Sequence, residues 1–125
     1  MANVGSVFLR IPESEWIAQN SSVFAVFDAH PASPGHALII PRRLVASWFA
    51  ATKGEVDGAL DLLHVVKDLI DERFSPAGYN VGFNDGLAGG QTVFHAHLHL
   101  IPRYSGDVAD PAGGIRHAVL GHGYY

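Results

Sequence analysis

The sequence contains no cysteine among its 125 residues, which excludes disulfides and any zinc site built on thiolates. It is also poor in basic residues, because eight Lys and Arg stand against twelve Asp and Glu, for a formal net charge of −4. With no basic run, general binding of nucleic acid is not expected. No stretch approaches the roughly 20 apolar residues that a membrane span needs, and residues 1–9 do not have the composition of a signal peptide. We therefore expect a cytoplasmic protein that binds neither a membrane nor nucleic acid.

What the sequence does contain is typical of one globular domain. Apolar residues make up 48% and charged residues 16% of the chain, and a chain of this length forms one core of modest size. We treat residues 1–125 as a single domain, with a variable N-terminal segment over about 1–20 and a C-terminal tail over about 111–125. Four stretches of β-branched, aromatic and alternating residues predict strands over 23–28, 36–41, 78–83 and 91–102.

The connections between these strands favour an antiparallel sheet. Two prolines and a glycine within residues 30–35 predict a tight turn between the first two strands. We expect a short helix over residues 13–18 behind Pro12, a helical turn over 44–51, and a strand edge in the tail from Ile115. Because the strands group around one long helix without β and α units in alternation, the fold class is α+β, with an antiparallel sheet of about five strands.

The long helix is the best-marked element of the sequence. Thr52 and Glu55 have the spacing of a capping box, which begins a helix, and Pro76 ends it after Phe74. Besides the main apolar row there is a second apolar flank, formed by Leu62, Val65 and Leu69. So wide an apolar arc has two explanations: the helix contacts another subunit, which would make a homodimer, or it is sunk deeper into its own core.

Close to the C-terminal end, His95, His97 and His99 lie on alternate positions, separated by single apolar residues. Strict alternation predicts a half-buried strand, on which the three histidines would share one face. Three interpretations are open. The histidines can be surface residues without chemistry, or metal ligands, for which only His36 is an obvious further partner. They can also serve nucleophilic catalysis at phosphorus, in which one imidazole attacks while its neighbours hold phosphate oxygens.

A glycine-rich loop over residues 84–90, just upstream of the histidines, favours catalysis at phosphorus. Backbone N–H groups and amide side chains can approach a phosphate closely there and stabilise its charge without a basic patch. The alternative is that Asn84 and Asp85 only build the turn.

The segment Gln91–Arg103 resembles the histidine triad (HIT) family, whose motif is three histidines separated by single apolar residues and followed by two more. The resemblance covers most of residues 20–110 in the expected order, and it includes Phe27-Asp28, Ser33-Pro34-Gly35-His36 and Gly82-Phe83-Asn84-Asp85-Gly86. It implies the HIT fold, with its sheet continued across a homodimer. Many family members carry an N-terminal Cys-x-x-Cys zinc element, which this chain does not have, so we expect no bound metal.

The resemblance also implies a role for each histidine. His97 is expected to be the nucleophile that attacks the α-phosphate, and the backbone carbonyl of His95 is expected to orient its ring. His99 is expected to contact the phosphate and to help protonate the leaving group. Three further residues are expected to contact the phosphate or the leaving group: Gln91, Thr92 and Asn84.

On the earlier strands, the resemblance assigns the nucleoside contacts. Asp28 is expected to bind the ribose hydroxyls, and His36 to support the triad from the neighbouring strand. Val26 and Leu38 are expected to line the nucleobase pocket. Two alternatives are open, since Asp28 can instead cap the following turn and the two apolar residues can be ordinary core.

Together these expectations describe a nucleotide hydrolase or transferase that works through a nucleotidyl-histidine intermediate. We favour dinucleoside polyphosphates as substrates, since Pro102-Arg103 after the triad is closer to the hydrolase-like branch of the family. The alternatives are a purine nucleoside phosphoramidase and a nucleotide-binding module with only incidental hydrolysis. No cofactor is required, although a divalent cation such as Mg²⁺ can accompany a polyphosphate substrate.

Overall fold

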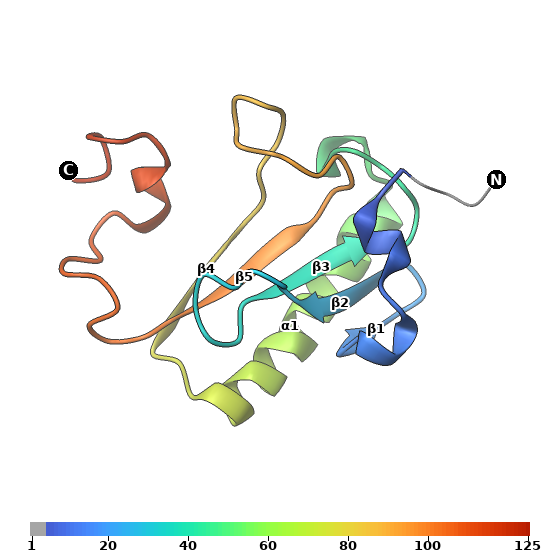
Figure 1. Cartoon of the computed structure of the whole chain (residues 1–125), viewed down its shortest axis with the longest axis horizontal. Coiled ribbons are helices and arrows are strands. Elements are labelled where there is room, and N and C mark those ends of the chain that lie inside the picture. Colours follow the sequence, from blue (N-terminus) through green and yellow to red (C-terminus); the bar gives the residue numbers. More distant parts are fainter. Residues whose placement is uncertain (1–4) are drawn as a thin grey trace.

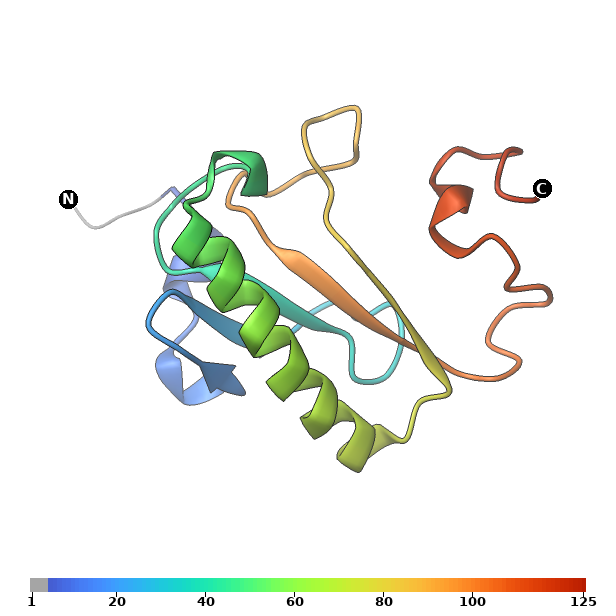
Figure 2. The ribbon, with the colours of Figure 1, turned by 180° about the vertical axis from the view of Figure 1, so that it is seen from behind.

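The computed structural model describes residues 5–125 and shows one sheet with a single long helix lying across one of its faces (Figure 1, Figure 2). The predicted α+β class, with five antiparallel strands, is confirmed. In spatial order the strands are β1 (Ala18–Gln19), β2 (Val23–Phe27), β3 (Ala37–Pro41), β5 (Leu98–Arg103) and β4 (Gly78–Gly82). Residues 1–4 of the predicted N-terminal segment lie outside the described part. Within residues 5–125, no helix combines the length and the apolarity needed to cross a membrane.

Helix α1 (Lys53–Phe74) begins and ends where the sequence predicts. Thr52 Oγ1 accepts from the Glu55 N–H at 3.1 Å, and Glu55 Oε1 accepts from the Thr52 N–H at 2.8 Å, so the predicted capping box is present. The helix ends at Ser75, which takes up the left-handed conformation at φ +50°. Its buried side chains lie against β2, β3 and β5: Ala59, Leu62, Val66 and Ile70.

The exposed flank of α1 separates the two explanations of its apolar arc. Leu62 is 3% exposed and belongs to the core, whereas Val65 and Leu69 are 50% and 44% exposed. The explanation that the whole arc is sunk into the chain's own core is therefore wrong. Contact of this flank with a second subunit stays a prediction.

The other face of the sheet is covered only in part. Over β2 and β3 the N-terminal segment closes a second apolar cluster, in which Phe8 packs against Val26 and Leu38. In the same cluster Trp16 stacks on Phe24 with ring centroids 4.3 Å apart. Farther along this face, over β5 and β4, the sheet borders two cavities instead of a core.

The strand register sets one row of side chains across this second face. Val26 pairs with Leu38, Leu38 pairs with His99, and His99 pairs with Gly82. Because partners in an antiparallel pair lie on the same face, two apolar side chains on β2 and β3 lead directly to a histidine on β5.

Two predicted elements at the ends of the chain are wrong. In place of the expected helix, residues 13–15 form the 3₁₀ turn η2 (Glu13–Glu15) and Ala18 already belongs to β1, because the Ile17 N–H donates to the Ala25 carbonyl at 2.9 Å. The tail forms the 3₁₀ helix η4 (Gly114–Ala118) and no strand edge, since Gly113 and Gly114 at positive φ turn the backbone away from an extended course. The fifth strand is thus β1. The expected helical turn within 44–51 is present as η3 (Trp48–Ala50), and a further 3₁₀ turn, η1 (Val7–Arg10), precedes η2.

The histidine strand is shorter than predicted, and the three histidines do not share one strand face. Strand β5 begins only at Leu98, which pairs with Ile39. Continuing that register would place Ala96 opposite Pro41, which has no N–H to donate. The Ala96 N–H donates instead to the Val45 carbonyl at 2.7 Å. His95 and His97 therefore precede the strand and are held by individual hydrogen bonds.

Candidate active site

A cavity of about 800 Å³ lies beside the histidine segment, between the N-terminal segment and the open face of the sheet. Seven of the predicted site residues line it: Val26, Asp28, Leu38, Asn84, Thr92, His97 and His99. Its apolar side is completed by Phe8, Ile11 and Val93. A volume of this size with a few convergent polar groups is typical of a small-molecule site.

His97 presents one ring nitrogen for chemistry. Its Nδ1 lies 2.8 Å from the His95 backbone carbonyl. Since a carbonyl only accepts, Nδ1 carries the proton and Nε2 of the neutral ring keeps its lone pair. The ring is further fixed by the edge of Phe8, with centroids 5.0 Å apart. His97 is therefore held in the tautomer that a nitrogen nucleophile needs.

His95 is fully buried and does not line the cavity. Its Nε2 donates to the Pro41 carbonyl at 2.7 Å, which leaves Nδ1 to accept from the Ser6 hydroxyl at 2.8 Å. Ser6 Oγ in turn accepts from the Phe8 N–H at 3.1 Å. Burial lowers the pKa of His95, so its ring is neutral. His95 thus acts on His97 through its backbone.

Sequence reasoning missed the contribution of Ser6 and Phe8. The two residues stand almost ninety positions before the triad, and neither belongs to the motif. The available signal was a serine in front of an apolar stretch, which is typical of a helix cap and does not indicate a partner so distant along the chain.

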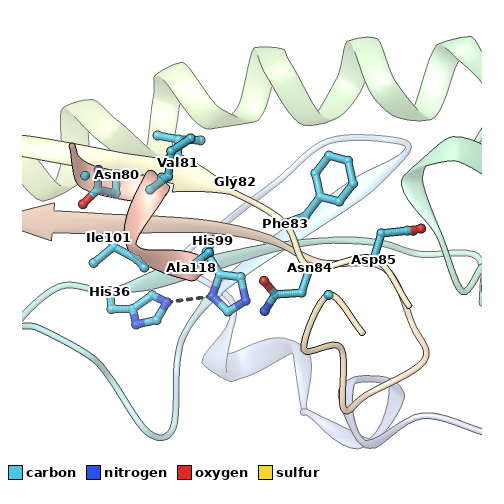
Figure 3. Close-up of a pocket in the computed structure, with 13 residues that line it drawn as sticks. His36, Asn80, Val81, Gly82, Phe83, Asn84, Asp85, His99, Ile101 and Ala118 are labelled. Atoms are coloured by element: carbon cyan, nitrogen blue, oxygen red, sulfur yellow. Dashed lines mark hydrogen bonds between the residues drawn. The ribbon is translucent and has the colours of Figure 1, made fainter. Parts of the chain in front are cut away.

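His99 is supported by His36, as Figure 3 shows. The Ala32 N–H donates to His36 Nδ1 at 2.9 Å, so His36 carries its proton on Nε2. That N–H donates a hydrogen bond to His99 Nδ1, also at 2.9 Å. His99 must then carry its own proton on Nε2. That atom is buried and has no hydrogen-bond partner among the described residues. A buried N–H without a partner can donate a hydrogen bond to an anionic oxygen of a ligand.

The charge state of the two rings follows from their surroundings. Burial lowers the pKa of His99 to about 4, with His97 and His36 adding to the effect and Asp28 opposing it. Burial also lowers the pKa of His36, again against the opposing effect of Asp28. Both rings are therefore neutral at pH 7, and His99 donates a hydrogen bond without carrying a positive charge.

Asp28, His36 and His99 also bring ligand-type atoms within 4.8 Å of one another, which raises the question of a metal ion. In the metal-free structure His36 Nε2 carries the proton of the hydrogen bond to His99. A metal ion bound there would displace that proton and break this hydrogen bond.

Asp28 combines two contacts. Its Oδ1 accepts from the His30 N–H at 2.9 Å, which is the turn-capping contact weighed above, and its Oδ2 lies 3.5 Å from His36 Nε2. The carboxylate nevertheless lines the cavity, at the end of β2.

Gln91 is buried and takes no place in the cavity lining. Its Nε2 donates to the Ala46 and Val93 carbonyls at 2.7 and 3.1 Å, and its Oε1 accepts from the Gly86 N–H at 3.0 Å. The side chain therefore holds the glycine-rich loop in place. A Cβ on Gly89 would clash with the Asp85 carbonyl oxygen, so the loop closes more tightly than a residue with a side chain would allow there.

Comparison with known proteins agrees with this architecture. The HIT domain profile matches residues 11–106. A HIT-like protein of Mycoplasma pneumoniae is 37% identical over 109 residues, which are 83% of this chain and 75% of that protein. The asymmetrical bis(5'-nucleosyl)-tetraphosphatase of Schizosaccharomyces pombe is 33% identical over 82% of this chain, and the match covers 57% of that enzyme's length. The crystal structure of a HIT family protein from Bacillus anthracis superimposes with a TM-score of 0.75 at 32% identity, over 81% of this chain and 74% of that one.

Proposed function

Because the chain belongs to the HIT domain family, which its residues 11–106 match, we propose that it is a nucleotide hydrolase or nucleotidyltransferase. In this proposal His97 attacks the α-phosphate of a nucleotide conjugate. The observation that carries the proposal is the pair of tautomers at the cavity: His97 offers a lone pair on Nε2, and His99 offers an N–H.

The proposed reaction has two steps. The lone pair of His97 Nε2 forms an N–P bond while the bond from phosphorus to the leaving group breaks, and the leaving group departs with the electron pair. A water molecule then attacks phosphorus, the N–P bond breaks, the lone pair returns to His97, and a proton of the water is released to solvent. The His99 N–H donates to a non-bridging phosphate oxygen, where negative charge grows in both transition states.

The residues that follow the triad, Pro102 and Arg103, are closer to the hydrolase-like branch of the family. We therefore favour dinucleoside polyphosphates over phosphoramidates. The tetraphosphatase of S. pombe, with 33% identity, supports the same choice.

The nucleoside is proposed to bind on the β2 and β3 side of the cavity. Val26 and Leu38 form the floor, Phe8 faces them from the N-terminal segment, and a purine ring fits between such apolar walls. The Asp28 carboxylate is the nearby acceptor for the ribose hydroxyls. Mg²⁺ would enter with the polyphosphate and needs no ligand set of its own on the protein.

We also propose that the protein is a homodimer. Two features support this: the exposed apolar flank of α1 at Val65 and Leu69, and the position of β4 at the edge of the sheet, where a second copy can continue it. Sedimentation velocity at micromolar concentration is expected to give a dimer. A monomer under those conditions would contradict this part of the proposal.

Replacement of the nucleophile tests the reaction. With diadenosine tetraphosphate and Mg²⁺, His97→Asn is expected to lower kcat by about 10⁴-fold or more, because the residue acts as part of a catalytic unit. His64→Asn, an exposed histidine on α1, is the matched control and is expected to leave kcat unchanged. Turnover by His97→Asn close to that of the wild type would refute the assignment.

A further inference from the structure

The cavity beside the histidine segment has two carboxylates in its lining, Asp28 and Glu15. Asp28 accepts from the His30 N–H and lies 3.5 Å from His36 Nε2. Glu15 belongs to the exposed turn η2, and within residues 5–125 its side chain forms no hydrogen bond or ion pair. Both of its carboxylate oxygens can therefore accept from a ligand in the cavity.

Glu15 and the catalytic histidines lie at opposite ends of the cavity. The chain after Glu15 leads directly into β1, which pairs with the outer side of β2. His99 lies on β5, so β2 and β3 separate it from β1. Neighbouring strands are about 4.8 Å apart, which puts about 14 Å between β1 and β5. Figure 1 shows the N-terminal segment, in blue, crossing this side of the sheet before it enters β1.

The side chains between the two ends set the direction in which a nucleoside would lie. Val26 and Leu38 pair in the floor, and Ile11 packs on the same cluster from the N-terminal segment, four positions before Glu15. With the phosphate at His99 and the ribose at Asp28, a purine on this floor points its outer edge toward β1. That outer edge is the Watson–Crick edge, because it lies opposite the bond to the sugar.

For the outer edge of the base, this end of the cavity offers an acceptor and few donors. The lining holds no Lys or Arg in the part of the chain that the structure describes. Its amide and hydroxyl side chains, Asn84 and Thr92, belong to the glycine-rich loop and the histidine segment. A carboxylate can only accept hydrogen bonds. Glu15 is thus suited to a base that presents donors on its outer edge.

The two common purines differ at this edge. Guanine presents two adjacent donors, N1–H and the N2 amino group, which match the two oxygens of one carboxylate. Adenine presents a single amino group beside N1, whose lone pair would face a carboxylate oxygen. A carboxylate at this position therefore favours guanine.

We propose that Glu15 selects guanine in the nucleoside site by accepting from N1–H and from the N2 amino group. This inference rests on the proposed function, which brings the nucleotide into the cavity. Because Glu15 is exposed, water can replace a lost partner, and the expected preference is about tenfold, far below the roughly 10⁴-fold of a buried hydrogen-bonding site.

Three dinucleoside tetraphosphates with Mg²⁺ test the proposal, since they differ only in the base. Diguanosine tetraphosphate has both donors, the inosine compound keeps N1–H without the amino group, and diadenosine tetraphosphate has neither arrangement. The variant is Glu15→Gln, whose amide can pair with either purine because it carries one donor group and one acceptor. Glu13→Gln is the matched control, since Glu13 is exposed in the same turn and does not line the cavity.

For the wild type we expect kcat/KM to be about tenfold higher with the guanosine than with the adenosine compound, and intermediate with the inosine compound. Glu15→Gln should bring the guanosine-to-adenosine ratio to about one, and Glu13→Gln should leave it at about ten. A wild-type ratio of one or less, or a ratio that Glu15→Gln leaves unchanged, would overturn the assignment while the proposed function stands.

Absence of turnover with all three compounds would contradict the proposed function, and binding then tests the base site separately. Isothermal titration calorimetry should show that GMP binds about tenfold more tightly than AMP, and that Glu15→Gln removes this difference. Equal affinity for the two nucleotides, or binding of neither, would overturn the role of Glu15.

Discussion

The two faces of the sheet differ in what their side chains do, although the same strands supply both. The face under α1 carries a continuous apolar core in which Ile39 and Leu100 meet Leu62 and Val66. On the opposite face, the residue next to Leu100 is His99, which is one link in a chain of hydrogen bonds. A one-residue step along β5 thus separates a side chain that stabilises the fold from one that serves the site.

Stability and chemistry can therefore be changed separately in this protein. Variants on the helix side should alter the free energy of unfolding and leave turnover intact in the folded fraction. Variants on the open side should lower turnover and leave the free energy of unfolding nearly unchanged. The N-terminal segment is the exception. Ser6 and Phe8 pack on His95 and His97, so variants there should alter both stability and turnover.

The largest expected effect on the free energy of unfolding is on the helix side. Leu62→Ala should lower the free energy of unfolding by about 3 kcal/mol, since it removes a fully buried side chain and leaves a cavity. Leu60→Ala, on the same helix but 51% exposed, is the matched control and should cost far less. Urea denaturation measures both, and equal losses for the two variants would show that α1 does not pack as described.

On the open face, His36→Phe removes the donor to His99 while keeping a ring of similar shape. We expect kcat to fall about 10- to 100-fold, less than the roughly 10²- to 10³-fold cost of removing a transition-state donor outright, because His99 stays in place but loses its fixed tautomer. Steady-state kinetics with His64→Phe as control would measure this. An unchanged kcat would mean that His36 has no positioning role.

The smallest effect is expected in the N-terminal segment, at Ser6. Ser6→Ala should lower the free energy of unfolding by about 1–2 kcal/mol, because the buried Nδ1 of His95 loses its donor. We also expect a fall in kcat of a few-fold, since the His95 carbonyl orients His97. Ser105→Ala, at an exposed turn, should change neither quantity. If Ser6→Ala lowers stability without any change in kcat, the link from Ser6 to His97 is absent.

Much of this architecture could be predicted because the signals are local. The capping box at Thr52, the stop at Pro76 and the turn between β2 and β3 each depend on residues close together in the chain, and the structure confirms them. The spacing of the histidine motif likewise brought His97 and His99 to one cavity with Asp28.

What could not be predicted depends on contacts between distant residues. The alternation at His95 to His99 gave no sign that Pro41, on another strand, would end the ladder at Leu98. The contact of Ser6 with His95 arises only when the chain is folded. Gln91 also shows this limit, because sequence alone does not show that its amide would be used to hold the loop.

The covalent role of His97 is the central claim, and direct capture of the intermediate tests it most directly. The protein is mixed with diadenosine tetraphosphate and Mg²⁺, quenched within milliseconds under alkaline denaturing conditions that preserve an acid-labile N–P bond, and digested for mass spectrometry. We predict an adenylyl group on His97 that is absent in His97→Asn and unaffected by His64→Asn. Wild-type turnover without any adduct, or an adduct on His99 or another residue, would contradict it.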